Sequence, residues 1–196
     1  PAVTGVMHGE SDTLRAIAVS PDGKTLAVVD YNAGLLFFDA RTYERVGEPL
    51  PVDPVGGHRA GNGLESLAYS PDGRTVAVGG DEIVRLIDAR TREQLAEAAV
   101  GGAAMRMAFT KDGSQLVVLF APGGPGGWGE ENAQITIRDA ATLEPIGLSV
   151  EPKAFVGTYV GSYFELPGFA LMPDGRSVVI ATEEDELVWW NLRRRT

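Results

Sequence analysis

Several residue types that carry chemistry are scarce in this chain of 196 residues. It has no cysteine, which excludes disulfide bonds and thiolate metal ligands. Its only histidines are His8 and His58, so no Ser-His-Asp set can be argued, and no Gly-x-Ser-x-Gly nucleophile turn is present. We therefore expect no catalytic residues, no cofactor and no bound metal.

The chain also lacks the features that two classes of partner require. Its 17 lysines and arginines against 27 aspartates and glutamates give a formal charge of −10, which disfavours binding to a phosphate backbone. No apolar stretch approaches the ~18 residues of a membrane-spanning helix. We expect no nucleic acid and no membrane as partners. The missing cysteine agrees with a reducing compartment, so we expect a cytoplasmic protein.

The chain contains four copies of a six-residue sequence motif. Each copy lies between two short apolar runs, and its third and fourth residues are Asp and Gly. Asp bonds its own backbone and Gly supplies a positive φ, so the phrase predicts a tight turn between two strands. The copies are Ser20–Thr25, Ser70–Thr75, Thr110–Gln115 and Met172–Ser177.

A second tight turn closes each unit and begins at Asp39, Asp88, Asp139 or Asn191. The distance from the first phrase is 18 or 19 positions, except in the third unit, where Ala121–Glu130 is inserted. Each unit is thus predicted to hold four antiparallel strands, a to d. A small residue recurs two positions before the first turn, at Ala18, Ala68, Ala108 and Ala170. Small residues at one strand position suit a radial array whose inner strands crowd toward an axis.

These turns resemble those of the WD-repeat β-propeller family, in its bacterial form. The pair that names the family is present in altered form as Phe38-Asp39, Ile87-Asp88, Arg138-Asp139 and Trp190-Asn191. The resemblance covers nearly the whole chain and implies an all-β propeller of four-stranded antiparallel blades, four in this chain. The related YVTN-type propellers are an alternative. The expected blades span about 12–50, 62–100, 103–150 and 164–196, with 1–7 as the outer strand of a neighbouring or closing blade.

Closure of the ring is the next expectation. Most propellers of this family have seven or eight blades, and Pro1 in place of Met indicates a piece of a longer protein. The pattern predicts that Leu187–Leu192 is a strand c with no strand d after it and that Ala2–Met7 is a lone strand. Four blades would need about 90° each, and radial arrays extend to ~8 blades at a gentler angle. We expect two chains to join head to tail as a homodimer with eight blades.

Three long insertions are expected on one end of the blades, opposite the short turns: Pro51–Gly63, Ala121–Glu130 and Glu151–Tyr163. Insertions on one face of a repeat array mark a binding face. The candidate partner-binding residues are Trp128, Tyr159, Phe155, Tyr31, His58 and Arg59. The alternative for the aromatic residues is packing against their own blade.

The resemblance implies a non-catalytic protein-interaction scaffold, as the sensor or recruitment part of a bacterial multidomain regulator. One alternative is a propeller enzyme of the lactonase or hydrolase type with a metal in its axial channel. That enzyme needs inward carboxylates or histidines on strands a, which here supply mainly apolar side chains. The other alternative is a secreted or periplasmic binding propeller.

Overall fold

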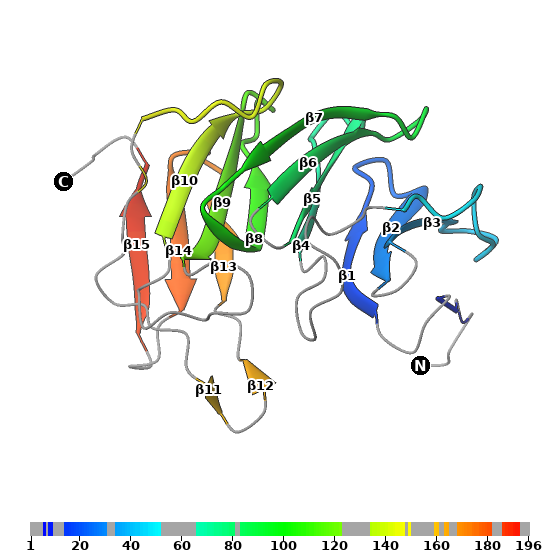
Figure 1. The fold of residues 1–196 in the computed structure, drawn as a ribbon, viewed down its shortest axis with the longest axis horizontal. Coiled ribbons are helices and arrows are strands. Elements are labelled where there is room, and N and C mark those ends of the chain that lie inside the picture. The colour runs from blue at the N-terminus through cyan, green and yellow to red at the C-terminus, as the bar shows by residue number, and fades with distance from the viewer. Residues whose placement is uncertain are drawn as a thin grey trace.

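The computed structural model describes residues 6, 8–9, 14–30, 34–51, 66–80, 83–122, 134–147, 149, 159–160, 163–164, 168–181 and 186–192. These residues form antiparallel sheets (Figure 1), and among them no helix is long and apolar enough to cross a membrane. The strands are β1 (Leu14–Val19), β2 (Thr25–Asp30), β3 (Gly34–Asp39), β4 (Ser66–Tyr69), β5 (Thr75–Gly79), β6 (Ile83–Asp88), β7 (Gln94–Ala99), β8 (Gly102–Phe109), β9 (Gln115–Pro122), β10 (Gln134–Asp139), β11 (Tyr159–Val160), β12 (Tyr163–Phe164), β13 (Phe169–Leu171), β14 (Ser177–Ala181) and β15 (Leu187–Asn191).

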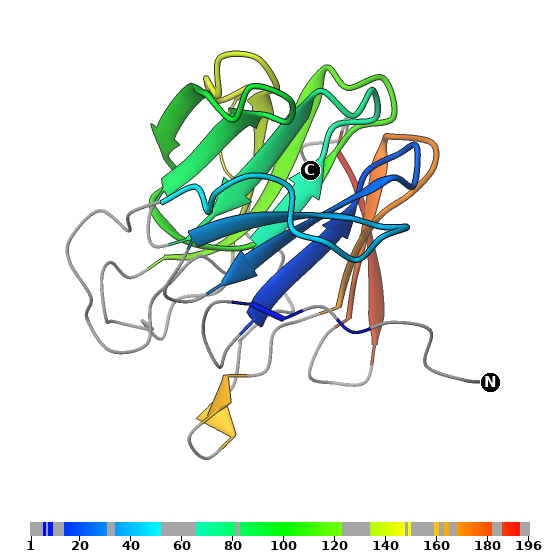
Figure 2. The same ribbon diagram turned by 90° about the vertical axis from the view of Figure 1, so that its right-hand side faces the viewer.

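Four of the sheets correspond to the four repeats. Blade 1 is β1-β2-β3, blade 2 is β4-β5-β6-β7, blade 3 is β8-β9-β10 and blade 4 is β13-β14-β15. The first strand of each blade is the inner one, since β1 packs on β4, β4 on β8 and β8 on β13. Figures 1 and 2 show the blades side by side in an arc, with blades 1 and 4 at its ends. The all-β class and the antiparallel order within each repeat are confirmed.

The repeated turn is closed by a hydroxyl group. Ser20 Oγ donates to Asp22 Oδ1 at 2.7 Å and accepts the Thr25 N–H at 2.9 Å. Ser70 and Thr110 make the same pair of bonds in the next two turns. The fourth turn begins with Met172, which has no hydroxyl group. There the Asp174 carboxylate accepts the N–H groups of Arg176 and Ser177.

The outer edge of the blades differs from the expectation of four full strands in each of the first three repeats. Blade 2 has a complete fourth strand, β7. In blade 1 the residues after β3 bond to it only at intervals: Val46 N–H donates to the Phe37 carbonyl at 2.8 Å, and Leu50 exchanges two bonds with Leu35. Pro49 has no N–H to donate, and Gly47 has φ +77°, so the strand is interrupted between these contacts.

The loop expected over Glu151–Tyr163 contains a hairpin. Tyr159 in β11 pairs with Phe164 in β12, and Val160 pairs with Tyr163. The physical reason lies in the local sequence, where β-forming residues flank the two-residue link Gly161-Ser162.

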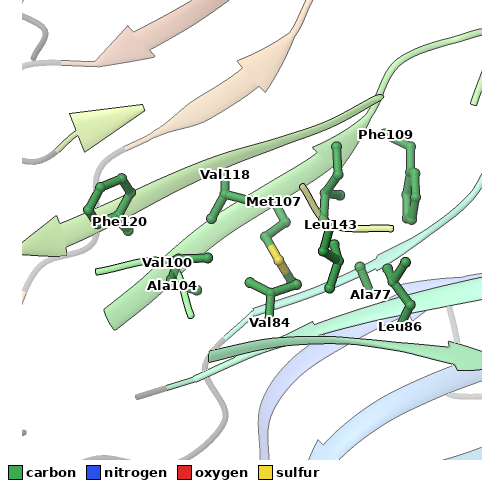
Figure 3. Close-up of a cluster of buried hydrophobic side chains, with 11 residues drawn as sticks. Ala77, Val84, Leu86, Val100, Ala104, Met107, Phe109, Val118, Phe120 and Leu143 are labelled. Carbon is green, nitrogen blue, oxygen red and sulfur yellow. The ribbon is translucent and has the colours of Figure 1, made fainter. Parts of the chain in front are cut away.

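The core consists of apolar layers between successive blades. Side chains alternate between the two sides of a strand, so each blade has a leading side toward the preceding blade and a trailing side toward the next. On β2 of blade 1, Ala27 and Val29 are on the trailing side and pack with Val76 and Val78 of blade 2. The layer between blades 2 and 3 (Figure 3) contains Ala77, Val84, Leu86, Val100, Ala104, Met107, Phe109, Leu116, Val118, Phe120 and Leu143.

Candidate functional site

The partner-binding residues predicted from the sequence are mostly not among those that the structure describes. Tyr31, His58, Arg59, Trp128 and Phe155 lie outside the described residues. The sixth, Tyr159, begins β11 and pairs through its backbone with Phe164. The shared face of the three insertions also lies largely outside the described ranges, so it stays a prediction.

The described surface offers a different site, at the end of the blades that carries the short turns. A groove of about 970 Å³ lies between blades 1 and 2. Its walls are the turn of blade 1 around Pro21 and Asp22, the turn of blade 2 from Pro71 to Arg74, and the second turn of blade 2 from Asp88 to Arg92. A groove of about 710 Å³ lies at the corresponding place between blades 3 and 4. We call the first the blade 1–2 groove.

Arg92 is the central cation of the blade 1–2 groove. It follows the turn that begins at Asp88, with φ +68°, and its N–H donates to the Asp88 carbonyl at 2.9 Å. Its guanidinium carbon lies 3.3 Å from the centre of the Phe37 ring of blade 1, a cation–π contact. Its Nη1 is buried and has no hydrogen-bond partner. Burial lowers the pKa of Arg92, but arginine remains charged at neutral pH.

Tyr69 is the second polar group in this layer. It ends β4 and packs against the cluster that contains Phe37. Its hydroxyl oxygen is buried without a hydrogen-bond partner. Burial raises the pKa of Tyr69 to about 12, because the phenolate would lose its hydration, while the charge of Arg92 opposes this shift. The phenol is therefore neutral at pH 7 and keeps its O–H as a donor.

The next repeat carries apolar residues at both positions. Leu143 stands four residues after Asp139 as Arg92 stands four after Asp88, and its φ is +61°. Phe109 precedes the third turn as Tyr69 precedes the second. Both are buried in the layer between blades 2 and 3 (Figure 3). Sequence reasoning missed the polar pair, because the residue four positions after the start of each second turn varies among the repeats, as Tyr43, Arg92, Leu143 and Arg195.

The carboxylates of the groove accept hydrogen bonds from residues of their own turns. The Ser20 hydroxyl and the Lys24 N–H lower the pKa of Asp22, and the Ser70 hydroxyl and the Arg74 N–H lower that of Asp72. Asp88 accepts the N–H groups of Arg90 and Thr91, which lowers its pKa. Across the described part of the chain, no group of three or more His, Cys, Asp or Glu residues could hold a metal.

The ends of the arc form a second candidate surface. On the trailing side of blade 4, Leu187 is 59% exposed and Trp189 is 62% exposed. Their counterparts in blade 1, Leu35 and Phe37, are at most 2% exposed because blade 2 covers them. At the opposite end, Ile17 on the leading side of blade 1 is 64% exposed. Other residues of that leading side are buried, since Val28, Leu36 and Phe38 are at most 4% exposed.

Comparison with known proteins agrees with this architecture. The family model described as "WD domain, G-beta repeat" matches residues 50–88. No curated protein matches the sequence. Solved structures match over nearly the whole chain at 14–21% identity, which shows the fold alone. One is a chain from the crystal structure of the mitotic checkpoint complex, with a TM-score of 0.70 at 18% identity, covering 96% of this chain and 52% of that one.

Two further solved structures have similar scores. Hydrazine synthase of Kuenenia stuttgartiensis has a TM-score of 0.69 at 21% identity, covering 98% of this chain and 50% of that one. The Cps50 (Swd1) β-propeller domain of Myceliophteria thermophila has a TM-score of 0.66 at 14% identity, with 97% and 55% covered. The chain thus spans about half the length of the solved chains that it matches.

Proposed function

We propose that this chain, which has the fold of a β-propeller and a WD-repeat match over residues 50–88, is a non-catalytic protein-interaction scaffold. Its native setting in this proposal is the cytoplasm, as the sensor or recruitment part of a bacterial multidomain regulator. The bacterial form of the turns at Ser20–Thr25 and Ser70–Thr75 supports that setting. The observation that carries the proposal is the exposed trailing side of blade 4, because an apolar sheet face of this kind is covered by protein in the other blades.

The first partner of this scaffold is a second copy of the chain. Blade 4 leaves a trailing side open and blade 1 leaves part of a leading side open, and these are the two sides that meet between all other blades. If two chains are placed head to tail, blade 4 of each chain packs against blade 1 of the other. The result is a ring of eight blades with two-fold symmetry. In this proposed arrangement residues 1–7, which the sequence predicts to form a strand, complete the edge beside β15.

Light scattering at micromolar concentration tests the ring. One chain has a mass of 20.8 kDa, so the ring has twice that mass. We expect a single species near 42 kDa, and the variant Leu187→Glu should shift it to about 21 kDa because a charge would be buried in the new layer. The control is Leu95→Glu, since Leu95 is similarly exposed on the outer strand β7. A monodisperse species of about 21 kDa for the unmodified chain would rule the ring out.

The absence of catalysis has its own test. The purified chain should not hydrolyse ester, lactone or phosphate ester substrates above the rate of a heat-inactivated sample. Turnover that copurifies with the chain through several columns would favour the propeller enzyme, whatever the light-scattering result.

A further inference from the structure

We propose that the blade 1–2 groove binds the carboxylate of an acidic peptide segment, with Arg92 and Tyr69 as the donors. The site rests on the proposed scaffold function in that its partner is a protein. It lies within one chain and does not depend on the eight-bladed ring. Four steps support it: the unpaired donors, their apolar counterparts, the occupied acceptors of the groove, and its charge balance.

The first step is the unpaired state of the two donors. Arg92 Nη1 and the Tyr69 hydroxyl oxygen are both buried, and neither has a hydrogen-bond partner. Buried polar groups in proteins are nearly always hydrogen-bonded, and an unpaired one destabilises the fold. A ligand that supplies an acceptor to both would remove this penalty.

The second step is that folding does not require polar groups at these positions. Blade 3 has Leu143 and Phe109 there, on a backbone with nearly the same φ and with full burial in the adjoining layer. Leucine and phenylalanine would fill the layer between blades 1 and 2 without unpaired atoms. The polar pair in blade 2 is thus a departure from the apolar pair of blade 3, and it weakens the core. Binding is a function that accounts for such a departure.

The third step identifies the chemistry of the ligand. A guanidinium group has N–H donors and no acceptor, and the Tyr69 phenol stays protonated at neutral pH, so the ligand must supply acceptors. The nearby carboxylates of Asp22, Asp72 and Asp88 accept bonds from their own turns. None of the carboxylates that the structure describes forms an ion pair with Arg92. A carboxylate of a partner is a planar acceptor that matches the guanidinium fork.

The fourth step is the charge of the groove. Its lining holds three carboxylates, those named above, and three guanidinium groups, Arg74, Arg90 and Arg92. The local charges balance, and the chain as a whole is at −10. This setting suits a single negative charge more than a phosphate dianion. Pro21, Val46 and Pro71 also line the groove and give apolar walls for the residues that flank the acidic one.

The experiment compares two capped tripeptides, acetyl-Gly-Glu-Gly-amide and acetyl-Gly-Gln-Gly-amide, by NMR titration of the ¹⁵N-labelled chain. We expect the glutamate peptide to shift the Arg92 Nε–H signal and the backbone N–H signals of the groove residues in a saturable way, and the backbone signals can be followed in every variant. The glutamine peptide should bind at least about tenfold more weakly, because it loses the charge-assisted bond. Equal affinity of the two peptides would overturn the proposal, as would saturation by inorganic phosphate at lower concentration than by the glutamate peptide.

Matched variants separate this site from general charge effects. Arg92→Leu and Tyr69→Phe install the residues that blade 3 carries, so they should fold, and each should weaken the glutamate peptide by about tenfold. Arg176→Leu removes a positive charge from the groove between blades 3 and 4 and should leave the affinity unchanged. If Arg176→Leu abolishes binding and Arg92→Leu does not, the assignment is wrong. Leu187→Glu should bind as the unmodified chain does, which distinguishes failure of the ring from failure of this site.

Discussion

Arg92 occupies in blade 2 the position that Leu143 occupies in blade 3, with the same left-handed backbone, at φ +68° and +61°. Leu143 completes an apolar layer, whereas Arg92 places a guanidinium on the Phe37 ring with Nη1 unpaired. Blade 3 thus shows that the fold accepts a leucine at this position. In blade 2 an arginine stands there, which packs less well but provides hydrogen-bond donors.

The double variant Tyr69→Phe/Arg92→Leu should be more stable than the unmodified chain. Each unpaired buried group costs about 1–3 kcal/mol, and the lost cation–π contact is worth about 0.5–2 kcal/mol. We expect the free energy of unfolding to rise by about 1–3 kcal/mol in urea titrations. Arg90→Leu, on the exposed part of the groove, should change it by less than about 0.5 kcal/mol. A loss of stability in the double variant would mean that the polar pair stabilises the fold.

Gly79 of blade 2 lies against blade 3 with no room for a side chain, so Gly79→Ala should destabilise the chain. An added Cβ would lie 2.6 Å from Ser66 Oγ and 2.8 Å from Ala104 Cβ. Overpacking of this kind costs about 1–3 kcal/mol. The matched control is Gly168→Ala, whose Cβ would meet Ala181 Cβ at 3.1 Å and should cost less. Thermal unfolding by circular dichroism measures both, and equal melting temperatures would contradict the close contact.

Met172→Ser should stabilise blade 4. The first three turns close through the hydroxyl groups of Ser20, Ser70 and Thr110, and the fourth lacks one. A serine there would bond to the Asp174 carboxylate and to the Ser177 N–H, for a gain of about 0.5–1.5 kcal/mol. The reciprocal variant Ser70→Met should lose stability. If both variants lie within the error of the urea midpoint, the hydroxyl group does not contribute to the turn.

Stability should fall on acidification between about pH 4 and pH 2. The Thr110 hydroxyl and the Ser114 N–H and hydroxyl lower the pKa of Asp112 to about 2, from an ordinary value of 3.8. Because the folded pKa lies below the unfolded one, the unfolded chain binds the proton first. The stabilisation is therefore complete above pH 4 and is lost as the pH falls through 2. The turn carboxylates Asp22, Asp39, Asp72, Asp88, Asp139 and Asp174 shift in the same direction.

Asp112→Asn isolates one of these groups. This variant should be less stable than the unmodified chain at pH 6, and the difference should shrink toward pH 2, where the aspartate is protonated as well. Melting temperatures across that range provide the measurement. A constant difference at every pH would show that the charge of Asp112 has no part in closing the turn.

The open edge at blade 4 could be predicted in part from the sequence. The strand c over Leu187–Leu192 was predicted to lie at an open edge, and β15 ends its sheet among the described residues. The aromatic candidates Trp128 and Phe155 lie outside those residues, so their role in binding stays a prediction. The Arg92–Tyr69 pair was not predicted, because the two residues come from different turns and meet Phe37 only when blade 2 packs on blade 1.

The sequence by itself determined the turns, the strand order and the alternation of sides. Those features depend on neighbours within a few residues. The Ser20 hydroxyl donates to the Asp22 carboxylate, and the next residue, Gly23, adopts φ +72°. The tertiary structure decided which side of each strand is covered and which polar atoms lose their partners. Leu35 and Leu187 occupy the same repeat position with the same chemistry, yet one is buried and the other exposed. Burial depends on whether another blade lies alongside, and no local pattern of residues encodes that.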